Sequence, residues 1–189
     1  MVYLDVEGKV LAVHEGPRDA EGFAKTGKKA AAFVELREKA GKGDAAARLD
    51  LLMLQLELGQ VGDEEAGKQL KDLSKPTPEQ QKRIEALRAG AAVKAVVATI
   101  RDEKSEIEAG KKFLEMRKAG RPEPPGDGEA QPYWICIMYY AEEKKDADTY
   151  EMALKALKAR FGAVEEAKDF FKTAEQHLQE LRTDKAEKK

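Results

Sequence analysis

The chain has 189 residues, of which 42% are hydrophobic and 37% are charged, and its 34 Lys and Arg nearly balance its 36 Asp and Glu. This composition is typical of a globular protein rather than a disordered chain. Because the formal charge is only -2, no basic field suggests nucleic-acid binding. The apolar stretches fall well short of the roughly 20 residues that span a bilayer, so no membrane association is expected.

The first 41 residues predict a β-hairpin followed by a helix. Tyr3 to Val13 form two short strands around Gly8, which can adopt the positive φ of a tight turn. Gly16-Pro17 then favours a helix start, and the helix extends to Gly41 with a break or kink near Thr26. Its apolar stripe contains Phe23, Ala30, Ala31, Val34 and Leu36.

Residues 42–120 predict a helical region. Gly43-Asp44 precedes a leucine-rich helix over 45–58, and a shorter helix over 64–73 ends at Ser74-Lys75-Pro76. Thr77-Pro78-Glu79-Gln80 has the pattern of a capping box with proline at the first helical position. Two more helices follow, and Gly120 ends the second.

The remainder divides into a loop, a helical region and a tail. Residues 121–132 are rich in Pro and Gly and predict a loop, whereas Tyr133 to Tyr140 are apolar on all sides and predict a buried helix. Within the C-terminal helical region 133–182, Asp148 or Thr149 is the expected cap of the next helix, and Gly162 ends it. A last helix carries a continuous apolar seam, and 183–189 is a charged tail.

The predicted fold is therefore mostly α, either a helical bundle or a degenerate helical repeat, with a short N-terminal β-hairpin. Trp134, Ala153 and Gly162 resemble a degenerate tetratricopeptide unit. However, the chain has no self-similar period of about 34 residues, so an irregular bundle is the favoured alternative.

The hairpin and the start of the first helix resemble the last hairpin and final helix of the thioredoxin fold. The resemblance rests on Val2 to Leu11, then Gly16, then Asp19-Ala20-Glu21-Gly22-Phe23. In that family, a strand ending in Leu-Asp, a Gly-Lys turn, a second strand, a glycine and an acidic helix with Phe follow in this order. The later helices are similar to the extensions that follow the thioredoxin fold in some bacterial proteins.

The family's redox site is missing from this chain. That site pairs a Cys-x-x-Cys with a cis-proline just before the strand matched by Val2 to Asp5, and thiol exchange needs both thiols. Cys136 is the only cysteine, and we expect it to be a buried core residue. The chain is therefore either a fragment of a longer thioredoxin-like protein, which we favour, or a natural remnant. In either case the exposed hairpin edge suggests dimerisation by strand pairing.

Other chemistry finds little support in the sequence. Gly22 to Lys28 and Gly62 to Lys68 imitate a phosphate loop, but Lys29 and Gln69 stand where Ser or Thr should hold magnesium. His14 and His177 are not spaced for a metal site, so neither a metal nor a cofactor is expected. Glu103, Glu106 and Glu108 are typical of a solvated helix face rather than an acid/base pair.

These patterns favour a noncatalytic helical protein-interaction or scaffolding module, attached to or derived from a thioredoxin-like protein. The expected partner is another protein or a second copy. The candidate contact residues are Tyr133, Trp134, Tyr139 and Tyr140, beside the Pro-rich loop. The alternative is the C-terminal part of a thiol-disulfide oxidoreductase whose cysteines lie upstream of Met1. Because Met1 to Asp5 do not resemble a leader, a cytoplasmic location is expected, or an extracytoplasmic one if a longer parent carries a leader.

Overall fold

The computed structural model describes residues 1–14, 19–73 and 75–186, and it confirms a mostly α fold with a short N-terminal antiparallel hairpin. The chain forms two compact units, Met1–Ala91 and Ala92–Lys189, whose boundary lies inside a helix and away from the boundaries expected at 41, 120 and 132. Within the described residues, no helix is long and apolar enough to cross a membrane.

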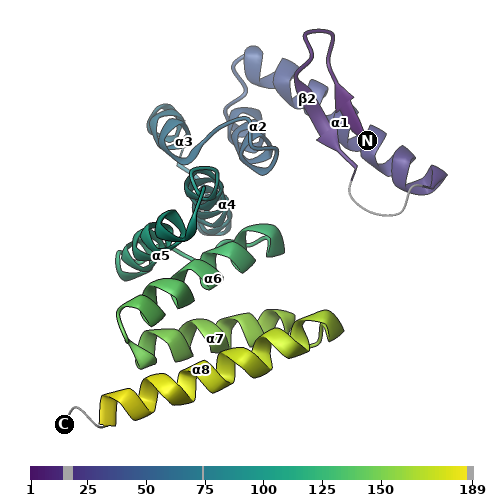
Figure 1. Ribbon diagram of the computed structural model, residues 1–189. Coiled ribbons are helices and arrows are strands. Elements are labelled where there is room, and N and C mark those ends of the chain that lie inside the picture. The colour runs from purple at the N-terminus through teal and green to yellow at the C-terminus, as the bar shows by residue number, and fades with distance from the viewer. Residues whose placement is uncertain (15–18, 74, 187–189) are drawn as a thin grey trace. The chain divides into compact units, whose positions relative to one another are not determined.

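The first unit begins with the predicted hairpin, formed by β1 (Val2–Leu4) and β2 (Val10–Val13) (Figure 1). Gly8 has a φ of +79°, which L side chains rarely adopt, so glycine suits the turn. Asp5 organises the same turn, because its Oδ1 accepts hydrogen bonds from the N–H groups of Glu7 and Lys9 at 2.9 and 2.8 Å.

Helix α1 (Ala20–Gly41) packs against the hairpin. Its cap is Asp19, whose side chain accepts a hydrogen bond from the Gly22 N–H at 2.7 Å. The helix was expected to start at Gly16 and Pro17, which lie outside the described residues. The predicted break near Thr26 is wrong. The Thr26 side chain is buried and its hydroxyl donates to the Gly22 carbonyl at 2.9 Å within a continuous helix. Phe33, absent from the predicted stripe, is the most buried side chain of the helix.

Three further helices complete the described part of the first unit: α2 (Ala45–Glu57), α3 (Asp63–Gln69) and the first part of α4 (Pro78–Val97). The predicted caps are confirmed, because Asp44 accepts from two backbone N–H groups, and Thr77 and Gln80 form the reciprocal capping pair at 3.0 and 3.2 Å. The helix expected to extend to Leu73 is α-helical only to Gln69 and continues as the 3₁₀ turn η1 (Leu70–Asp72). Ser74 lies outside the described residues.

The second unit contains α5 (Glu103–Lys118), α6 (Asp127–Glu143), α7 (Ala147–Phe161), the 3₁₀ turn η2 (Glu165–Ala167) and α8 (Lys168–Ala186). Successive helices lie side by side, and α6, α7 and α8 alternate in direction (Figure 1). As predicted, α6 is buried, and Phe171, Ala174, Leu178 and Leu181 of α8 join the core of the unit.

Three predicted boundaries are wrong in this unit. The loop over 121–132 ends at Gly126, because the Gly126 carbonyl accepts from the Ala130 N–H at 2.9 Å and so starts α6. The cap of α7 is Asp146, which accepts from the Thr149 N–H at 3.1 Å, rather than Asp148 or Thr149. The expected tail at 183–189 is helical to Ala186, and 187–189 lie outside the described residues.

Two backbone positions show how tightly these helices are joined. A Cβ atom added to Gly110 of α5 would lie 1.9 Å from the carbonyl oxygen of Cys136 in α6, so only glycine allows this close approach. Lys145, in the short turn between α6 and α7, has a φ of +52°, a left-handed conformation that favours glycine.

Candidate interaction surface

The structure separates the four aromatic residues that the sequence grouped as a contact region. All four lie on α6, but Tyr133 and Trp134 are 2% and 1% exposed and therefore belong to the core. Tyr140 is partly buried, and its Cβ lies 2.9 Å from the position of a Cβ at Gly110 of α5. Tyr139 is 39% exposed, which makes it the most exposed of the four and the one most accessible to a partner.

Tyr133 and Trp134 form an aromatic cluster with Phe113 of α5. Tyr133 lies 5.1 Å from the Phe113 ring and meets Trp134 edge to face at 4.9 Å, distances that are favourable for aromatic pairs. The Arg117 guanidinium lies 5.1 Å from the Trp134 ring and covers it. The two residues therefore hold α5 and α6 together.

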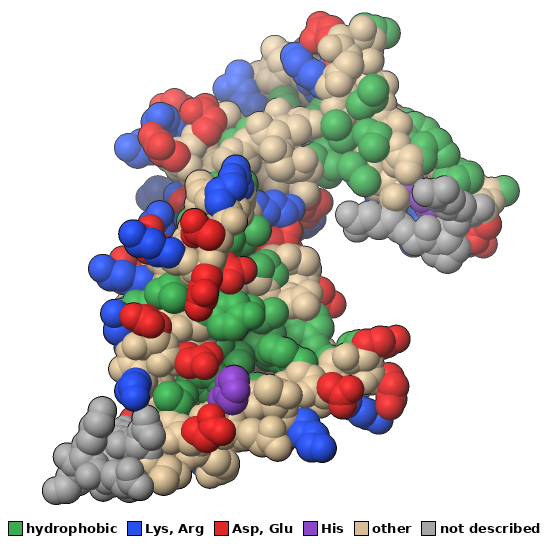
Figure 2. All heavy atoms as spheres, viewed as in Figure 1, with side chains coloured by type: hydrophobic (Ala, Val, Ile, Leu, Met, Phe, Trp, Pro, Cys, Tyr) green, Lys and Arg blue, Asp and Glu red, His purple; other side chains and the backbone are tan. Residues whose placement is uncertain are grey.

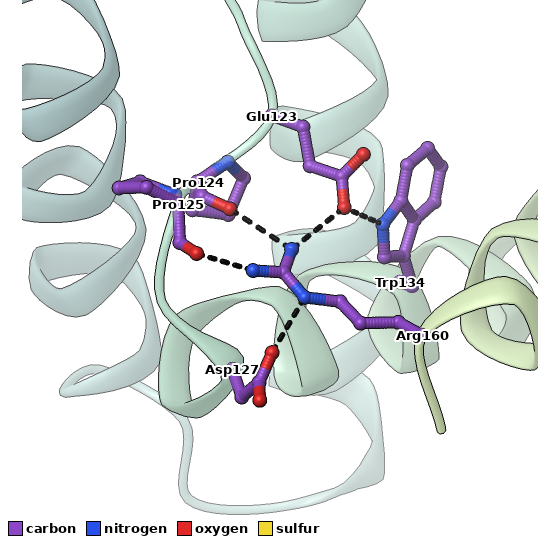
Figure 3. Close-up of polar contacts among 6 residues, drawn as sticks. All are labelled: Glu123, Pro124, Pro125, Asp127, Trp134 and Arg160. Carbon is purple, nitrogen blue, oxygen red and sulfur yellow. Dashed lines mark hydrogen bonds and ion pairs between the residues drawn. The ribbon is translucent and has the colours of Figure 1, made fainter. Parts of the chain in front are cut away.

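The Pro-rich loop beside these aromatic residues is fixed to α7 by Arg160 (Figure 3). The Arg160 guanidinium pairs with Glu123 at 2.9 Å and Asp127 at 2.6 Å. It also donates to the carbonyl oxygens of Pro124, at 3.1 Å, and Pro125.

The same Glu123 oxygen that contacts Arg160 accepts the indole N–H of Trp134 at 2.9 Å (Figure 3). A single carboxylate thus joins the loop, the core aromatic side chain and α7. Since the Arg160 guanidinium, the Trp134 indole N–H and one oxygen each of Glu123 and Asp127 are engaged within the unit, we assign the cluster a structural role.

A groove of about 690 Å³ lies beside Tyr139 and is formed by α5, α6, the turn after α6, and α8. Its lining residues are Glu103, Glu106, Ile107, Tyr139, Glu142, Glu143, Lys145 and His177. The four carboxylates therefore outnumber the one lysine and the one histidine. Figure 2 shows acidic side chains next to exposed apolar ones on the face of this unit that it presents.

The electrostatics of the groove act directly on Tyr139. Burial raises the pKa of its hydroxyl, and the negative charges of Glu106, Glu142 and Glu103 raise it further. His177 reaches the groove from α8, where its Nδ1 lies 3.6 Å from a Glu142 oxygen. The groove consequently combines a partly exposed aromatic ring with a negative potential.

Cys136 lies in the core of the second unit and is 3% exposed. Burial, with a smaller contribution from Glu106, raises the pKa of its thiol to about 11, so the thiol is protonated at neutral pH. Among the described residues, no group of three or more His, Cys, Asp or Glu side chains is arranged to hold a metal ion. The segment from Gly22 to Lys28 lies entirely within α1, without the loop that a phosphate needs.

Sequence reasoning missed the groove because its residues come from distant parts of the chain. Glu103 and Glu106 were predicted to be an ordinary solvated face, and His177 was considered as a metal ligand, which its spacing does not support. The groove exists only when α5, α6 and α8 pack together. The one local signal was the exposed aromatic residue Tyr139, but α6 is apolar on all sides, so its pattern could not distinguish Tyr139 from its buried neighbours.

Comparisons of the chain with protein-family models, with curated proteins and with solved structures found no match.

Proposed function

We propose that this chain is a noncatalytic helical protein-interaction or scaffolding module, and that its partner binds in the groove around Tyr139. The observation that carries the proposal is the 39% exposure of Tyr139 within a groove formed by three helices. Tyrosine is enriched at protein interfaces because it offers a large, rigid apolar surface together with a polar group. The other three aromatic residues of α6 support this surface from within the unit.

The charges of the groove favour a partner segment that carries Lys or Arg. Four carboxylates line the groove, and its other ionisable side chains, apart from Tyr139, are Lys145 and His177. The carboxylates are those of Glu103, Glu106, Glu142 and Glu143. A basic side chain would gain both from the negative potential and from contact with the Tyr139 ring. Because such attraction is screened by ions, we expect binding to weaken as the salt concentration rises.

A photo-crosslinking experiment in the native cell tests this proposal. A photoreactive phenylalanine analogue replaces Tyr139 in one variant and Phe170, which is 38% exposed on α8, in a control variant. We expect the Tyr139 site, and not the Phe170 site, to form an adduct with a Lys- or Arg-rich segment. The double substitution Glu106→Lys and Glu142→Lys should abolish this adduct, while Glu64→Lys and Glu79→Lys in the first unit should leave it intact. Adducts that form equally at both sites, or that survive the groove substitutions, would contradict the proposal.

We further propose that the module is attached to, or derived from, a thioredoxin-like protein. The hairpin supports this proposal, because α1 covers only one of its two faces. The other face carries Val2, Leu4 and Val13, which are 48%, 54% and 41% exposed. Two strands alone are marginal in water, and an open apolar face is typical of a sheet that further structure covers in a larger fold.

The same observation favours the alternative function, the C-terminal part of a thiol-disulfide oxidoreductase with its cysteines upstream of Met1. The genomic DNA upstream of the Met1 codon distinguishes the two. An in-frame segment encoding Cys-x-x-Cys and the family's proline supports the enzyme, whereas a stop codon immediately upstream supports the noncatalytic module.

A further inference from the structure

The outer edge of β1 carries backbone groups that point away from β2. The Met1 carbonyl accepts from the His14 N–H at 2.8 Å, and the Asp5 N–H donates to the Lys9 carbonyl at 2.9 Å, so both residues face β2. Because the backbone N–H and C=O groups of successive residues in a strand point to opposite sides, those of Val2 and Leu4 point away from β2. In the described part of the chain the sheet contains only β1 and β2, so these groups form an open edge.

The two edges of the hairpin differ in how they are covered. On β2, the side-chain amide of Gln60 donates to the Val10 carbonyl and so covers part of that edge. On β1, the side chains from Met1 to Leu4 carry none of the charges that commonly protect an edge strand from pairing. The β1 edge is therefore the better acceptor of another strand.

The side chains beside this edge are apolar and exposed. Val2 and Val13 face each other across the hairpin, and Leu4 lies on the same face because side chains alternate along a strand. The opposite face is buried, since Leu11 and Ala12 pack against Ala30 and Phe33 of α1. Figure 2 shows apolar side chains gathered over the hairpin. A strand added to β1 would extend this apolar face.

We infer that β1 pairs antiparallel with β1 of a second copy, about a twofold axis at Tyr3. This inference rests on the proposed noncatalytic module, because upstream strands of an oxidoreductase sheet would occupy the same edge. In this register Val2 lies opposite Leu4 of the second copy, and each pair exchanges both of its backbone hydrogen bonds. The outward groups of Val2 and Leu4 are then all satisfied. A shift that places Val2 opposite Val2, or Leu4 opposite Leu4, leaves some of them unpaired.

Charge and strand number also favour a second copy as the occupant. The Asp5 carboxylate is held by Arg37 at 2.7 Å and its side chain is 5% exposed, so its charge does not repel an identical edge. The two strands of each copy would together form one four-stranded sheet. Such a sheet is more stable than a two-stranded ribbon, which is marginal in water. Since β1 has only three residues, the contact falls well below the roughly 800 Å² per partner of a standard interface, and the dimer should be weak.

Sedimentation velocity from micromolar to millimolar concentration tests this inference. We expect a reversible monomer–dimer equilibrium that Leu4→Lys weakens by about tenfold or more, because it places a charge beside the apolar pair. Val6→Lys adds the same charge in the turn, at a fully exposed position off the strand, and should change the dissociation constant by less than about twofold. Circular dichroism checks that both variants keep the wild-type helix content.

Crosslinking tests the register independently. In a Cys136→Ala background, Val2→Cys protein is mixed with Leu4→Cys protein and treated with a short bismaleimide. We expect the mixed crosslink to exceed either symmetric one, because Val2 lies opposite Leu4 of the second copy. A monomer throughout the concentration range, equal effects of Leu4→Lys and Val6→Lys, or predominance of the symmetric crosslinks would each overturn the inference.

Discussion

The two units bury their apolar side chains in different ways. In the second unit, the buried side chains of α5 to α8 form one continuous cluster that contains Phe113, Tyr133, Trp134, Tyr150 and Phe171. In the described part of the first unit, the buried side chains form separate smaller clusters. One of these joins the hairpin to α1 and α2. The other two join α2 to η1 and α4, and one of them also includes Ala66 of α3.

This difference has consequences for stability. Large aromatic side chains that contact one another across several helices couple those helices, so their unfolding should be cooperative. Smaller clusters that share no side chains can open separately, and the cluster of the hairpin and α1 shares none with the other two. We therefore expect α5 to α8 to exchange their amide hydrogens as one block, and the hairpin with α1 to open at lower free energy.

The largest expected effect on this contrast comes from Trp134→Ala. The substitution leaves a cavity in the core and removes the hydrogen bond to Glu123, so we expect a loss of about 3–5 kcal/mol from the second unit. Hydrogen exchange followed by mass spectrometry should show reduced protection throughout α5 to α8 and unchanged protection in α1 to α3. Equal loss in both regions would mean that the chain unfolds as a single unit.

A smaller effect of the same sign is expected for Gly110→Ala. Alanine favours a helix over glycine by about 1 kcal/mol, but the added Cβ would clash with the Cys136 carbonyl and push α5 from α6. We expect a net destabilisation of roughly 1–3 kcal/mol, measured by urea unfolding with Trp134 fluorescence.

Gly128→Ala provides the matched control, because a Cβ at that helical position meets no atom within 4 Å. This variant should be as stable as the wild type or slightly more stable. If Gly110→Ala behaved in the same way, the close approach of α5 and α6 would not be needed for stability.

The smallest effect should be a gain in stability from Lys145→Gly. Glycine removes the strain of the left-handed backbone between α6 and α7, and we expect a stabilisation of roughly 0.5–1 kcal/mol in the same urea experiment. Lys145→Ala removes the same charge but keeps the Cβ, so it should not stabilise the unit. A gain in both variants would assign the effect to the lysine charge instead.

The sequence predicted features whose physical cause lies within a few residues. The capping pair of Thr77 and Gln80, the cap at Asp44 and the turn at Gly8 follow from local hydrogen bonds and backbone preferences. Boundaries with competing local signals were less well predicted. At the start of α7, for example, Asp146, Asp148 and Thr149 are all suitable caps, and only the position of the helix selects Asp146.

The candidate surface was only partly predictable for a related reason. The apolar pattern of α6 identified a buried helix but could not tell which aromatic side chains face its neighbours. The burial of Trp134 and the exposure of Tyr139 depend on where Phe113, Gly110 and α8 lie around the helix. A group selected by sequence proximity therefore contained both core and surface residues.

By itself, then, the amino-acid sequence determined the helical class, most helix ends, the N-terminal hairpin and the burial of α6, because short-range hydrogen bonding and apolar periodicity control them. Only the tertiary structure decided the division into two units within α4, the fixing of the Pro-rich loop by Arg160 and the acidic groove beside Tyr139. Each of these depends on side chains that are far apart in the sequence, and their contacts form only when helices pack at particular distances.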